Sequence, residues 1–192
     1  MKKLGLMILL SVVIYAYDIS KTQDIVQRGD KLYKPFEDKP YSGIGKLTMK
    51  QGDKCTIIIT NANKGVPNGK TEFWSCEGQL LRKGTMLNGK QIGVWERWDK
   101  KSGIKISKTI YSQEGKIISE ESWNKNDGTK SSNLVYSKDG EIISGFQKYK
   151  RKGKVFHDLT YKDGKKSGWE KNYKKGTIVF YENGKIVKEV KK

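Results

Sequence analysis

The chain repeats itself at a nearly regular interval. Successive units open with a small residue, and these openers lie 26, 24, 26, 26 and 23 residues apart: Gly43, Gly69, Gly93, Ser119, Gly145 and Gly168. In most units an aromatic residue follows four or five positions later: Trp74, Trp98, Trp123, Tyr149 and Tyr173. Such a period indicates a repeat architecture, in which each unit packs chiefly against its neighbours in sequence.

Each unit is expected to form one β-hairpin. Short stretches of aromatic and β-branched residues end at dipeptides suited to tight hairpin turns: Asn88-Gly89, Asp127-Gly128, Asp139-Gly140, Asp163-Gly164 and Asn183-Gly184. No window shows sustained helical periodicity. We therefore predict an all-β fold, an elongated and twisted antiparallel meander of about six hairpins over residues 43–192. Residues 17–42 are expected to form an N-terminal cap.

The recurring glycines and aromatics are interpreted as packing residues. A residue without a Cβ leaves room for a ring, so a Trp or Tyr is expected to lie over the glycine of an adjoining hairpin. This packing role is favoured over a binding platform for a set drawn from all units: Gly69, Trp74, Gly93, Trp95, Trp98, Trp123, Gly145, Tyr149, Gly168, Trp169 and Tyr173.

The first sixteen residues have the pattern of a secretory signal helix. Lys2 and Lys3 precede an apolar run, LGLMILLSVVIYA, that ends at Ala16. The run is shorter than the roughly 20 residues of a transmembrane helix, so a cleaved signal is favoured over a permanent anchor. We expect cleavage after Ala16 and export to the periplasm or the medium.

The two cysteines are predicted to form a disulfide. If residues 55–60 and 70–76 are partner strands of one hairpin, Ile59 pairs with Glu72 and Ile57 with Trp74. The same register places Cys55 directly opposite Cys76, within reach of an S–S bond. A metal site is disfavoured because the chain offers only these cysteines and His157 as soft ligands.

The chain is strongly basic, with 39 Lys and Arg against 21 Asp and Glu. Lysine on solvated strands gives solubility and keeps sheet edges from pairing. The alternative is a site for anions, for which the candidates lie in one segment: Lys148, Lys150, Arg151, Lys152 and Lys154. Anionic lipids or glycans are the expected ligands of such a site, whereas an exported protein would rarely meet nucleic acid.

Catalytic residues are scarce. His157 is the single histidine, and it lies in a strand-like segment. No glycine-rich nucleotide loop occurs, and the acidic residues Asp139, Asp163 and Glu182 belong to turns. We therefore predict a protein that is not an enzyme and has no cofactor or metal.

Three phrases resemble the MORN repeat of the bacterial MORN-repeat variant family: GKQIGVWERW at 89–98, YKDGKKSGWEKNY at 161–173 and YENGK at 181–185. The resemblance covers most of residues 30–190. It implies a non-catalytic solenoid of β-hairpins, a module that contacts proteins or membrane lipids, and many bacterial members are labelled antitoxins. Protein binding by an exported scaffold is our first expectation. Binding of anionic envelope lipids or glycans and a cytoplasmic antitoxin-like role are the alternatives.

Overall fold

The computed structural model describes residues 22–151, 154–172 and 176–191. These residues form sixteen strands: β1 (Gln23–Asp24), β2 (Val26–Arg28), β3 (Lys31–Tyr33), β4 (Gly43–Gln51), β5 (Lys54–Asn63), β6 (Val66–Ser75), β7 (Leu80–Leu87), β8 (Lys90–Trp98), β9 (Lys105–Tyr111), β10 (Ile117–Trp123), β11 (Lys130–Tyr136), β12 (Ile142–Arg151), β13 (Lys154–Lys162), β14 (Lys165–Asn172), β15 (Thr177–Glu182) and β16 (Lys185–Lys191). The predicted signal segment, residues 1–16, lies outside the described part of the chain.

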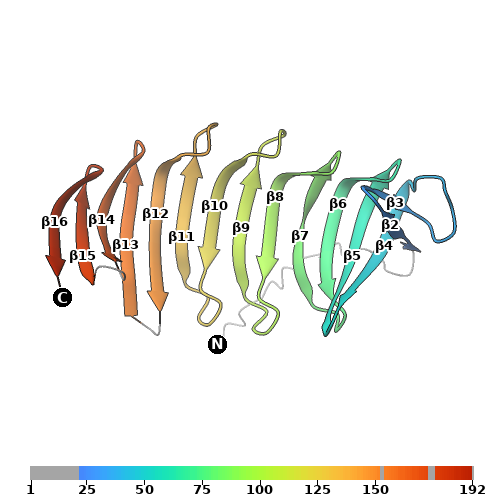
Figure 1. Ribbon diagram of the computed structural model, residues 1–192, viewed down its shortest axis with the longest axis horizontal. Helices are drawn as coiled ribbons and strands as arrows, with labels where there is room; N and C mark the ends of the chain where they lie inside the picture. Colours follow the sequence, from blue (N-terminus) through green and yellow to red (C-terminus); the bar gives the residue numbers. More distant parts are fainter. Residues whose placement is uncertain (1–21, 152–153, 173–175, 192) are drawn as a thin grey trace, which may run out of the picture.

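Fourteen of the strands form one long sheet (Figure 1). From β4 to β16 every strand pairs antiparallel with the next in sequence, so the predicted all-β meander is confirmed. The one departure is β1, which pairs parallel with β4. Within the described residues there is no helix, and hence none long and apolar enough to cross a membrane.

One sequence period corresponds to two strands. The six openers lie on alternate strands, β4, β6, β8, β10, β12 and β14, which confirms that each unit is a hairpin. Three of the predicted dipeptides form two-residue turns with positive φ at both positions: Asn88-Gly89, Asp163-Gly164 and Asn183-Gly184. In the other two only the glycine has positive φ, because Asp127 and Asp139 lie in longer connections.

The first hairpin, β2–β3, caps the start of the sheet. The amide of Leu32 donates to the Gly65 carbonyl at 2.9 Å, and the amide of Gly65 donates to the Tyr41 carbonyl at 2.7 Å. Ile25, Leu32 and Ala62 are buried together in a small hydrophobic cluster. These contacts hold the β2–β3 hairpin against the first strands of the sheet.

The two faces of the sheet differ in burial. Cross-strand register joins Trp95 to Thr109, and Thr109 to Glu120. Leu134 follows opposite Glu120, so all four side chains lie on one face, which we call the packed face. Most of the fully buried side chains of the repeats belong to it: Thr60, Thr71, Trp95, Thr109, Ser132, Leu134, Leu159, Thr177 and Val179. The core of this single-layer sheet is therefore mainly a row of side chains along one face, while the buried Ile59 and Glu72 lie together on the other face.

Cys55 and Cys76 form the predicted disulfide, with a Cα–Cα distance of 5.5 Å. The hairpin register is the predicted one, since Ile57 pairs with Trp74 and Ile59 with Glu72. The bridge ties the beginning of β5 to the residue after β6. It therefore closes the hairpin at the end opposite its two-residue turn.

Replacing both cysteines by serine is expected to lower the free energy of unfolding by about 3 kcal/mol, because the bridge restricts the unfolded chain. Urea unfolding of the oxidised, the reduced and the doubly substituted protein measures this change. The reduced wild type and the double variant should agree. If neither the reduced protein nor the double variant is less stable than the oxidised protein, the bridge does not stabilise the fold.

Candidate interaction surfaces

A ladder of alternating charges crosses the face opposite the packed face. Glu72 lies opposite Lys83, Lys83 opposite Glu96, Glu96 opposite Lys108, and Lys108 opposite Glu121. Glu96 forms ion pairs with Lys83 at 3.6 Å and with Lys105 at 3.3 Å. We call this side of the sheet the ladder face. Many of its central lysines are thus engaged with glutamates of neighbouring strands and are not a free cationic surface.

Three tryptophans line the ladder face: Trp74, Trp98 and Trp123. Each is half-buried, and opposite each of them the neighbouring strand has an irregularity in register. Two lysines lie over the Trp123 ring, Lys105 at 4.8 Å and Lys130 at 5.2 Å from its centroid. Such cation–π contacts hold the rings in place, so the ladder face presents fixed aromatic surface between paired charges.

The packing of the tryptophans differs from our expectation. Among the described glycines, Gly84 is the one that lies beneath a tryptophan, since a Cβ there would be 2.2 Å from Cδ2 of Trp95. Trp95 is 2% exposed and its Nε1 donates to the Thr85 carbonyl at 3.1 Å. Trp74 and Trp98 point to the ladder face because they follow Gly69 and Gly93 by five residues, an offset that reverses the side of the strand. Trp123 follows its opener by four residues and shares the ladder face with Ser119, which lies opposite Ile110. Trp169 also lies on the ladder face, opposite Asp158.

The opening glycines are matched with tyrosines instead. Gly93 lies opposite Tyr111, Gly145 opposite Tyr161, and Gly168 opposite Tyr181. Each of these tyrosines begins a similar polar segment of the sequence, YSQEGK at 111, YKDGKK at 161 and YENGKI at 181, so this second repeat pattern meets the opening glycines across the strands. Gly69 instead pairs with Met86. Of the other predicted packing residues, Tyr149 lies in β12 opposite His157, and Tyr173 is outside the described residues.

The described residues of the candidate anion-binding segment lie at the end of β12 and the start of β13. Lys148 forms an ion pair with Asp158 at 2.8 Å, which offsets one positive charge of the segment. Lys150 and Arg151 end β12, Lys154 begins β13, and Lys152 lies outside the described residues. The basic excess of the chain is concentrated from here on, since residues 141–192 carry 15 basic and 6 acidic residues.

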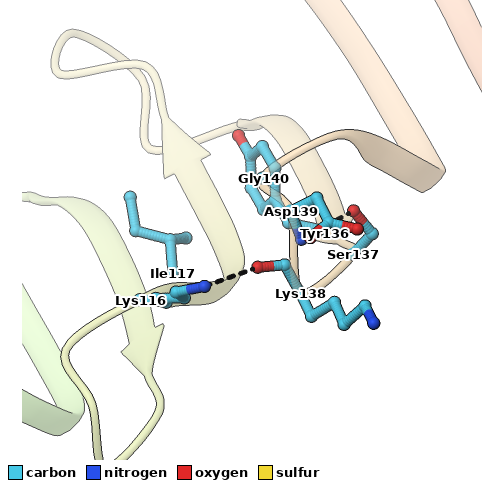
Figure 2. Close-up of a pocket in the computed structure, with 7 residues that line it drawn as sticks. All are labelled: Lys116, Ile117, Tyr136, Ser137, Lys138, Asp139 and Gly140. Carbon is cyan, nitrogen blue, oxygen red and sulfur yellow. Dashed lines mark hydrogen bonds between the residues drawn. The ribbon is translucent and has the colours of Figure 1, made fainter.

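A shallow pocket of about 390 Å³ lies between two neighbouring turns, residues 112–116 and 137–141 (Figure 2). Ile117 and Tyr136 provide its apolar lining, and Lys116 donates from Nζ to the Lys138 carbonyl at 3.2 Å along its rim. Burial and the nearby Glu120 carboxylate raise the pKa of Tyr136. Sequence patterns do not reveal this pocket, because it depends on the spacing of two turns.

The loop at residues 34–39, which is closed by the bridge between Tyr33 and Pro40, presents one aromatic side chain. Phe36 is fully exposed, at 104%, and has a φ of +63°. Arg28 braces this loop: it forms an ion pair with Asp38 at 3.0 Å and donates to the carbonyls of Lys34 and Glu37. The loop is therefore held in a shape that directs Phe36 into solvent.

Nothing in the described ranges gathers three or more His, Cys, Asp or Glu side chains as a set of metal ligands. His157 lies in β13, where Glu170 of β14 is opposite it. Comparison with known protein families and with curated proteins finds no family model and no protein that matches the chain.

Proposed function

We propose that this protein is a non-catalytic, exported scaffold of MORN-like hairpin repeats that binds another protein through its ladder face. The observation that carries the proposal is the row of half-buried Trp74, Trp98 and Trp123 set among paired charges. Protein interfaces are enriched in tryptophan and arginine and tend to bury their anchors among satisfied polar groups. A free cationic surface for polyanions would instead leave the lysines without carboxylate partners.

Export is supported by the signal-like N-terminal sequence and by the disulfide. Disulfides persist in oxidising compartments and are rare in the cytosol. Fractionation of the native host, with intact mass before and after reduction, tests this part. A chain that begins near Tyr17 and gains two hydrogens on reduction supports export. A full-length, reduced chain in the cytosol would favour an antitoxin-like role instead.

Photo-crosslinking from the ladder face tests the binding function. A photoreactive amino acid replaces Lys108, which lies on this face between Glu96 and Glu121. The matched control replaces Arg97, which neighbours it on the other face, opposite Ser107. In host cells we expect discrete protein adducts from position 108 and far fewer from position 97. Trp98→Ala combined with Trp123→Ala should abolish the adducts.

An anionic lipid or glycan is the second candidate ligand, favoured by the +9 formal charge of residues 141–192. Under that function the chain would bind phosphatidylglycerol vesicles through Lys148, Lys150 and Arg151, and binding would fall steeply with salt. Equal crosslinking from both faces, together with salt-sensitive vesicle binding, would contradict the protein-binding proposal and support binding of an anionic ligand.

A further inference from the structure

Phe36 is in an unfavourable state on two independent counts. Its ring contributes nothing to the core, because the side chain is fully exposed. Its φ of +63° lies in a region that bulky residues rarely adopt. The bracing contacts of Arg28 to Asp38 and to the carbonyls of Lys34 and Glu37 nevertheless fix this loop. A strained and exposed aromatic residue in a hydrogen-bonded loop has the properties of a binding anchor.

The same molecule has a concave apolar site that could receive such a ring. The pocket between residues 112–116 and 137–141 is lined by Ile117 and Tyr136, with Ile118 beside them. Ile117 is 39% exposed, so its apolar surface is removed from contact with water if the pocket is filled. Its volume of about 390 Å³ is well above the roughly 150 Å³ that holds a benzene ring in a protein cavity.

Charge does not oppose the contact at either surface. The loop at residues 34–39 has two lysines and two acids, Glu37 and Asp38. The pocket turns, residues 112–116 and 137–141, have two lysines and three acids, Glu114, Asp139 and Glu141. The loop is therefore formally neutral and the pocket turns carry a formal charge of −1, in a chain whose net charge is +18. Elsewhere the repulsion between two copies would be strong, so these two surfaces are well suited to meet.

We propose that Phe36 of one copy inserts into the pocket between residues 112–116 and 137–141 of a second copy. A copy's own pocket is out of reach, because the cap lies at the β4 end of the sheet and the pocket lies at β10–β12, several strands away (Figure 1). Loop and pocket are different surfaces, so the contact is heterologous. Each copy retains a free loop or a free pocket, and the association continues head to tail unless the chain of copies closes.

Sedimentation velocity over a range of protein concentrations tests the proposal with four proteins. Phe36→Gly removes the ring and relieves the positive φ, so it should raise the melting temperature while weakening association by about 10-fold to 150-fold. Ile117→Asp puts a charge into the pocket and should weaken association at least as much. Ile186→Asp is the matched control, because Ile186 is an exposed isoleucine on β16, outside the pocket.

Mixing the two variants separates this contact from every symmetric one. Phe36→Gly retains its pocket and Ile117→Asp retains its loop, so an equimolar mixture should form a dimer that cannot extend. Each variant alone should remain monomeric, and Ile186→Asp should associate like the wild type. A wild type that stays monomeric at all concentrations overturns the proposal. Association that persists in both variants, as edge pairing through β16 would, overturns it as well.

Discussion

Replacing Gly145 with alanine is expected to lower the free energy of unfolding by about 3–5 kcal/mol, through backbone strain and a steric clash together. The φ of Gly145 is +125°, where a side chain is strained in any surroundings. A Cβ would also lie 1.9 Å from the Asn133 carbonyl oxygen and 2.9 Å from Cα of Leu134. Both are backbone atoms of β11, so the clash is relieved only if β11 and β12 separate.

Gly140→Ala is the control for the strain component of this effect. Gly140 has a φ of +87° and nothing within 4 Å of its Cβ position. It should therefore lose only about 1–2 kcal/mol, the usual penalty for a side chain in the left-handed region. Urea unfolding measures both variants, and hydrogen exchange should show faster exchange of β11 and β12 amides in Gly145→Ala alone. Equal losses for the two variants would mean that the strands absorb the clash.

Removing the Trp95 side chain is the second large effect. Trp95→Ala should lower the free energy of unfolding by about 3–5 kcal/mol, as expected for a buried indole. The ring is 2% exposed, packs 6.3 Å from the Phe73 ring centroid, and lies 4.5 Å from the Arg82 guanidinium. Trp98→Ala is the comparison, and it should lose less because Trp98 is half-exposed on the ladder face.

A double-mutant cycle with Gly84, the glycine beneath the ring, tests how Trp95 is packed. Gly84→Ala in the wild type places a Cβ 2.2 Å from the Trp95 ring and should lower the free energy of unfolding by about 1–3 kcal/mol. In the Trp95→Ala background the same change should be neutral or stabilising, since alanine is preferred to glycine within a strand. Denaturation of the four proteins gives the coupling energy. Simple additivity would show that the ring does not rest on Gly84.

The charge ladder on the candidate surface also follows the sequence repeat, although the aromatic and glycine patterns do not include it. The glutamates of the ladder, Glu72, Glu96 and Glu121, recur 24 and 25 residues apart. Lys83 and Lys108 are separated by 25 residues, as are Lys105 and Lys130. A repeat that returns each position to the same place on the sheet predicts that these charges form a cross-strand row. Reading charge with the same period would have found the ladder.

The placement of the tryptophans illustrates the limit of spacing alone. Trp74 and Trp95 both follow an opening glycine, yet they lie on opposite faces of the sheet. Alternation along a strand makes the face depend on a single residue of offset. Register irregularities, such as the one between Lys83 and Thr85, then decide which backbone meets which ring. Trp95 thus lies against Gly84, a glycine outside the predicted set, whereas Trp74, Trp98 and Trp123 lie on the ladder face.

The sequence by itself determined the strand-by-strand meander, the hairpin period and the Cys55–Cys76 pairing, because these depend on local turn chemistry and on partners close along the chain. Only the tertiary structure decided which side chains share the packed face, which glycine supports Trp95, and how the turns at 112–116 and 137–141 enclose a pocket. Those features depend on register shifts and on the separation of strands in space. Neither is specified by any single hairpin, since each arises only when neighbouring hairpins pack together.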